Sequence, residues 1–173
     1  YQNRVLVRHE NINPITNTNL AVCDSSTCDT DIPFDVTGGN LVTEAGTELH
    51  VWTGKTFAPG GDLTLHGDAG VEPDGTLHVG AGSSFEAATG ETHTIAGSLD
   101  RLSGATMIAS DASFIFNATT TGKIITATSS PFYDLTFNGS GGGWSFPPGV
   151  VETVNDFTIS FGTVTLPTGT TTV

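Results

Sequence analysis

The chain has 173 residues, with 5 Lys and Arg against 18 Asp and Glu, so its formal net charge is -13 at pH 7. A chain this acidic has no basic patch for a phosphate backbone, which excludes nucleic-acid binding. It has no run of about 18 apolar residues, which excludes a membrane-spanning helix. Apolar residues make up 36% of the chain, enough to build the core of one folded domain.

The composition predicts an all-β protein. Thr and Gly are abundant, and no stretch free of Gly or Pro shows the apolar period of a helix. Short apolar–variable–apolar segments recur instead, each followed within a few residues by Gly, Asn, Asp or Pro. These segments are 49–51, 63–65, 77–79, 114–116, 135–137 and 157–159.

Residues 1–40 lack the regular spacing of the rest, and we expect them to form an N-terminal cap, with 5–7 as a strand. Cys23 and Cys28 enclose four residues, and in an acidic, Lys-poor chain with the features of an exported protein they predict a local disulfide. A zinc site would need further soft ligands. Asp24, Asp29 and Asp31 are candidate Ca²⁺ ligands, although their spacing does not match an EF-hand and favours a solvated loop. We expect no cofactor.

From residue 41 onward the apolar residues repeat at an interval of about 22. Three columns run through the chain, and turn residues follow the same interval at Gly60, Gly82 and Gly104, and at Asp134 and Asp156. The columns are Leu41, Leu63, Phe85 and Met107; Leu49, Val71, His93, Phe114, Leu135 and Phe157; and Phe57, Val79, Leu102, Ile124 and Phe146.

Three columns per interval describe a coil of three short strands and three turns. Residues 41–173 are therefore predicted to form a right-handed parallel β-helix, or β-solenoid, of about six coils. A β-sandwich is the alternative, but it does not require equal intervals. The sequence stops in mid-coil, so we expect a piece of a longer protein or an end that stacks on a partner.

The residues that could carry chemistry form weak patterns. His50, His66, His78 and His93 fall at different places around the repeating coil, so we expect no metal site among them. Paired carboxylates could hydrolyse a glycoside, and the candidate pairs are Glu48 with Asp62, Glu72 with Asp74, and Glu86 with Glu91. Arg101 and Lys123 lie inside the repeat, and Asp100–Arg101 is expected to be a surface ion pair. Trp52 and Trp144 are candidate sugar-stacking platforms.

The C-terminal part resembles a known class of repeat. Residues 132–146 read FYDLTFNGSGGGWSF, and 155–166 read NDFTISFGTVTL. Both are similar to the repeat units of very large bacterial cell-surface and secreted β-helix proteins of the adhesin type, over roughly 112–173. The resemblance implies a fold and a location rather than a reaction.

We therefore expect an extracellular structural or adhesive module of a surface protein or surface fibre, without catalysis. Its partners would be a neighbouring module or copies of itself, joined through the solenoid ends, and glycans are a further possibility. One alternative is a carbohydrate-binding or carbohydrate-cleaving β-helix. Another is a filament subunit that associates head-to-tail through exposed strand edges.

Overall fold

The computed structural model describes residues 41–42, 49–51, 56–59, 61–65, 75–126 and 130–173. The expected cap, with its cysteines and three aspartates, lies outside these residues. Every regular element that the structure describes is a strand, and none is a helix. The strands are β1 (Leu41–Val42), β2 (Leu49–Val51), β3 (Thr56–Phe57), β4 (Leu63–Leu65), β5 (Leu77–Val79), β6 (Ser84–Glu86), β7 (Thr92–Ile95), β8 (Leu99–Arg101), β9 (Thr106–Ile108), β10 (Ser113–Phe116), β11 (Lys123–Ile124), β12 (Phe132–Ser145), β13 (Val150–Thr165) and β14 (Thr170–Thr172).

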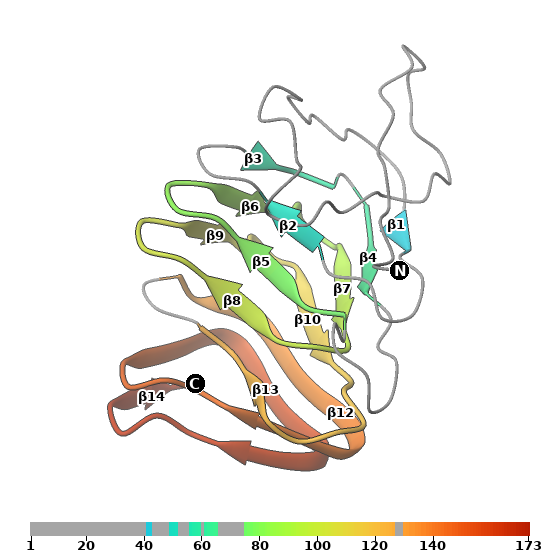
Figure 1. Ribbon diagram of the computed structural model, residues 1–173, viewed down its shortest axis with the longest axis vertical. Helices are drawn as coiled ribbons and strands as arrows, with labels where there is room; N and C mark the ends of the chain where they lie inside the picture. Colours follow the sequence, from blue (N-terminus) through green and yellow to red (C-terminus); the bar gives the residue numbers. More distant parts are fainter. Residues whose placement is uncertain (1–40, 43–48, 52–55, 60, 66–74, 127–129) are drawn as a thin grey trace, which may run out of the picture.

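The strands stack into a parallel β-solenoid, as predicted (Figure 1). One sheet runs β1-β4-β7-β10-β12-β13-β14 with β11 beside β12, and the other two run β2-β5-β8 and β3-β6-β9. All the strand pairs are parallel, so the β-sandwich alternative is wrong.

The solenoid makes about 4 turns, fewer than the six coils predicted. In the second half, single long strands replace separate short ones. Strand β12 has 14 residues and pairs with both β10 and β11, while β13 has 16 residues. Register shifts within the β12–β13 pair, such as the one between Phe137 and Asn138, accompany this change.

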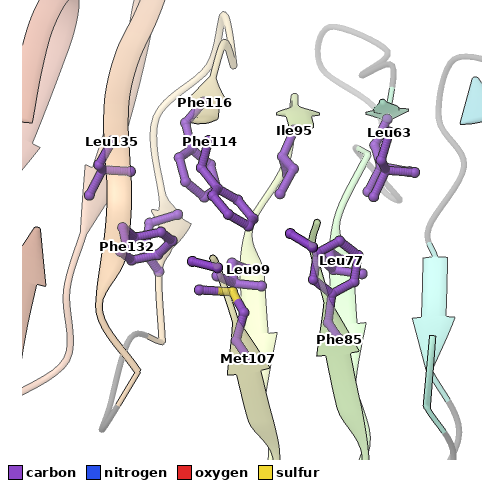
Figure 2. Close-up of a cluster of buried hydrophobic side chains, with 14 of the residues drawn as sticks. Leu63, Leu77, Phe85, Ile95, Leu99, Met107, Phe114, Phe116, Phe132 and Leu135 are labelled. Atoms are coloured by element: carbon purple, nitrogen blue, oxygen red, sulfur yellow. The ribbon is translucent and has the colours of Figure 1, made fainter. Parts of the chain in front are cut away.

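The core consists of apolar columns that run along the stack. His93 pairs with Phe114, Phe114 with Leu135, and Leu135 with Phe157, which confirms the predicted column in this part of the chain. The neighbouring strands supply further buried rings and aliphatic side chains, and Figure 2 labels ten of the core residues. Phe114 packs edge-to-face on Phe132, with ring centroids 5.3 Å apart.

The predicted interval is confirmed from β1 to β4, where Leu41 pairs with Leu63, but it is wrong for the next three strand pairs. Leu49 pairs with Leu77 and Phe57 with Phe85, so the step between these strands is longer than the predicted one. The step from β4 to β7 is longer still, as the pairing of Leu65 with Ile95 shows. Most of the additional residues therefore lie between β4 and β5, and they shift the strands on either side of them out of the predicted columns.

Two other members of the predicted columns face solvent. Leu102 is 55% exposed in the turn after β8, and Ile124 on β11 is 47% exposed. The turn glycines, in contrast, keep the predicted interval. Gly82 and Gly104 have φ of 66° and 75°, and a Cβ on Gly104 would lie 3.7 Å from the backbone N of Gly82. The two turns are thus stacked directly, in a conformation that favours glycine.

Candidate functional site

A buried polar cluster lies between β4 and β7. His93 is fully buried, and it occupies the column that holds Phe114 in the next coil. Its ring packs between Phe85 and Phe114, with centroid distances of 5.2 and 5.0 Å. An imidazole therefore occupies a core position that holds an apolar side chain in the next coil.

The cluster is held by hydrogen bonds to the backbone. The Leu63 N–H donates to Nδ1 of His93 at 3.3 Å, so Nδ1 carries no proton and Nε2 holds the one proton of the neutral ring. Nε2 lies 3.2 Å from Oε2 of Glu91 but makes no hydrogen bond to it or to any other atom of the described residues. The Glu91 carboxylate accepts the Ala88 N–H at 2.7 Å.

Burial dominates the charge state of His93. Desolvation lowers the pKa of His93 from 6.5 to about 4, although the nearby Asp62 carboxylate acts in the opposite direction. The ring is neutral at physiological pH. Because its surface is fully enclosed, it cannot reach a bound substrate as an acid or base. The cluster is suited to holding two coils together and to responding to acid.

A second imidazole, His78, lies on the outer face of β5. Its Nδ1 is 3.2 Å from Oδ2 of Asp100 on β8, and their side chains are 29% and 44% exposed. His50 is the register partner of His78 in β2. The expectation that these two histidines fall at different places around the coil is therefore wrong, because the additional residues between β4 and β5 align them. His66 lies outside the described residues.

Within the described ranges, no group of three or more His, Cys, Asp and Glu residues is placed to hold a metal ion. The candidate Ca²⁺ ligands Asp24, Asp29 and Asp31 are not among those residues, and neither are Cys23 and Cys28.

The predicted surface ion pair between Asp100 and Arg101 is wrong. Successive side chains of a strand point to opposite faces, so Asp100 faces out while Arg101 points inward and is only 6% exposed. Its Nε donates to the Thr126 carbonyl at 2.7 Å, and its Nη1 donates to Oγ of Ser130 at 2.9 Å. Lys123, the other basic residue singled out in the repeat, is also buried.

The described carboxylates of the candidate hydrolytic pairs have structural partners. Asp62 accepts the Thr92 N–H at 2.8 Å, and Glu86 accepts the Ser84 hydroxyl at 3.0 Å. Glu91 belongs to the His93 cluster. The remaining candidates, Glu48, Glu72 and Asp74, lie outside the described residues.

Trp144 is a core residue, which corrects its assignment as a sugar-stacking platform. It is 2% exposed and packs against Phe137 with ring centroids 5.0 Å apart. A Cβ added at Gly142 or Gly162 would collide with the indole ring. A sugar needs an exposed ring face, and Trp144 offers none. The glycines next to it in the sequence were the available signal of a close-packed ring. The other candidate, Trp52, lies outside the described residues.

Comparisons with protein-family models, with curated proteins and with solved structures find no match to this chain. No helix among the described residues is long and apolar enough to cross a membrane.

Proposed function

We propose that this chain is a structural and adhesive β-solenoid module of an extracellular surface protein or surface fibre, and that it has no catalytic role. The proposal rests on the described polar side chains, several of which form hydrogen bonds that join one coil to the next. Ser113 bonds to Asp134 at 3.1 Å, and Asp134 in turn accepts from Asn155 at 2.8 Å.

The same pattern appears elsewhere in the stack. The Ser98 N–H donates to the Thr76 hydroxyl at 3.0 Å, and Arg101 reaches two residues of the following segment. Such bonds add to the parallel backbone ladders and fix each coil on its neighbour. A stack of this kind suits a stiff spacer, because each coil contacts mainly the coils above and below it. The acidic composition and the resemblance to adhesin-type repeats support the extracellular location.

A glycan array combined with a reducing-sugar assay tests the proposal against the carbohydrate-binding alternative. We expect no release of reducing sugar from polysaccharides and no binding to a single glycan class at micromolar strength. If one glycan class binds by stacking a sugar on the ring of Trp52, the variant Trp52→Ala should abolish that binding. Trp144→Phe is the matched control, since the buried ring should not contribute. Turnover, or binding that depends on Trp52, would overturn the spacer role in favour of a carbohydrate-active β-helix.

A further inference from the structure

Residues of the metal-binding types form one row across the sheet β2-β5-β8. His50 is the register partner of His78, and His78 is the register partner of Asp100. The three strands lie one beside the next in Figure 1. Register partners on neighbouring strands are about 4.8 Å apart, so the three residues follow one another at that interval. The backbone thus aligns two residues that carry imidazole nitrogens with one that carries carboxylate oxygens.

The alternation of residues along each strand sets the face on which this row lies. The first residues of the three strands, Leu49, Leu77 and Leu99, are buried in the core. Successive residues of a strand face opposite sides, so the middle position of each strand is on the outer face. His78 and Asp100 agree with this placement, since both side chains are partly exposed. An ion in solution can therefore reach them.

The contact between His78 and Asp100 has the spacing of two ligands on one metal ion. Nδ1 of His78 lies 3.2 Å from Oδ2 of Asp100. Two donor atoms on one tetrahedral ion, with bond lengths of about 2.0–2.1 Å, are about 3.3 Å apart. An ion can therefore replace the proton that this pair shares with little movement of either side chain, and the proton leaves to solvent. His50 holds the next position of the row.

Charge and ligand type both favour a transition-metal cation. The Lys and Arg side chains that the structure describes, Arg101 and Lys123, are both buried, and Arg101 points away from Asp100, its neighbour in β8. The formal charge of -13 adds a field that attracts cations. Imidazole nitrogen suits Zn²⁺, Cu²⁺ and Ni²⁺, whereas Ca²⁺ and Mg²⁺ take oxygen ligands.

We propose that His50, His78 and Asp100 bind one divalent transition-metal ion, Zn²⁺ or Cu²⁺, on the outer face of the solenoid. Two imidazoles and one carboxylate supply the protein ligands, and water completes the coordination. Each ligand comes from a different coil, so the bound ion links three neighbouring strands and stabilises the folded chain more as its concentration rises. The site goes beyond the proposed spacer role, and a chain that binds no ion would overturn the site while leaving that role unaffected.

Isothermal titration calorimetry with ZnCl₂ at neutral pH tests the site in the full chain, after iodoacetamide has blocked any free cysteine thiol that would bind the same ion. We expect saturable binding that releases protons. His50→Asn, His78→Asn and Asp100→Asn should each raise the dissociation constant by at least about tenfold. His66→Asn is the matched control, because His66 follows β4, a strand of another sheet. That variant should bind Zn²⁺ like the parent chain.

Three outcomes of the titration would overturn the proposal. These are a parent chain without saturable Zn²⁺ binding, an unchanged affinity in any one of the three ligand variants, and an equal loss of affinity in His66→Asn. Circular dichroism shows whether each variant is folded. NMR on the parent chain gives a reading without any substitution, because paramagnetic Cu²⁺ at a low molar ratio should broaden the amide signals of β2, β5 and β8 before those of β12 and β13. Broadening that begins outside β2, β5 and β8 would overturn the site.

Discussion

Acid should destabilise this fold through His93. The pKa of its imidazole is about 4 in the folded chain against 6.5 for the ordinary group, so between these values the unfolded chain holds a proton that the folded chain lacks. Stability therefore falls as the pH drops below 6.5, and the loss is complete below about 4. The hydrogen bonding acts in the same direction, because a proton on Nδ1 would face the Leu63 N–H, which now donates to that atom.

The size of the effect follows from the pKa difference. A shift of about 2.5 pKa units corresponds to about 3 kcal/mol of unfolding free energy, at about 1.4 kcal/mol per unit. For a domain with a stability of about 5 to 15 kcal/mol this is a substantial fraction. Other groups also titrate in this range, so the contribution of His93 must be isolated by substitution.

His93→Asn is the informative variant, because its side-chain oxygen can accept the Leu63 N–H without titrating. Urea unfolding, followed by circular dichroism and by tryptophan emission, gives the unfolding free energy at several pH values from 7.5 to 4. The parent chain should lose about 3 kcal/mol more than His93→Asn between these limits. His78→Asn removes a half-buried imidazole on the outer face and should keep the loss seen in the parent. An equal loss in the parent and in His93→Asn would refute the reasoning.

Three further substitutions test the packing by thermal or urea unfolding. Gly139→Ala should destabilise by about 3 kcal/mol or more because its Cβ would overlap the Ala118 carbonyl. Gly90→Ala, with open space around it and a φ of +83°, should cost only about 1–2 kcal/mol. Equal costs for the two variants would contradict the close approach of Gly139 to Ala118. Arg101→Ala should cost about 2–4 kcal/mol, since it removes the donor to the Thr126 carbonyl and one of the two donors to Oγ of Ser130, and a neutral effect would show that these bonds contribute nothing. Phe114→Ala should cost about 3–5 kcal/mol through the cavity it leaves, and a loss below about 1 kcal/mol would contradict its place in the core.

The sequence predicted the later coils well because their spacing is nearly constant. From β7 to β13 each coil advances along the chain by almost the same step, so His93, Phe114, Leu135 and Phe157 fall into one column in both the sequence and the structure. An apolar period alone identifies the stack under these conditions, since each apolar side chain must meet another directly above it. The stacked turn glycines Gly82 and Gly104 follow for the same reason.

The same reasoning failed where the coil length changes. Apolar spacing cannot show how many residues a coil uses in its turns, because extra turn residues add no new column. The alignment of His50 with His78 was missed for this reason, although both lie at the centre of the same three letters, LHV, in the sequence. The ion pair between Asp100 and Arg101 failed differently, because sequence neighbours in a strand face opposite sides.

The same change of coil length explains why His93 lies in an apolar column. Where β10 follows β7 by a regular step, the Ser113 N–H donates to the backbone carbonyl of Glu91. Where β7 follows β4 by the longer step, the Thr92 N–H donates instead to the side chain of Asp62.

On the other strand of that pair, the Leu63 N–H donates to the ring of His93 rather than to a carbonyl. Side chains thus supply the acceptors that two buried or half-buried N–H groups require. A Phe in place of His93 would fit the column but would leave the Leu63 N–H without a partner, at a cost of about 1–3 kcal/mol. The acid-sensitive group therefore lies at the long step from β4 to β7, and protonation of His93 should open the stack at this junction first. Hydrogen exchange between pH 7 and pH 5 checks this order, because amides of β4 and β7 should lose protection before those of β10 and β12. Loss of protection in β12 first would show that the junction is not the weak point.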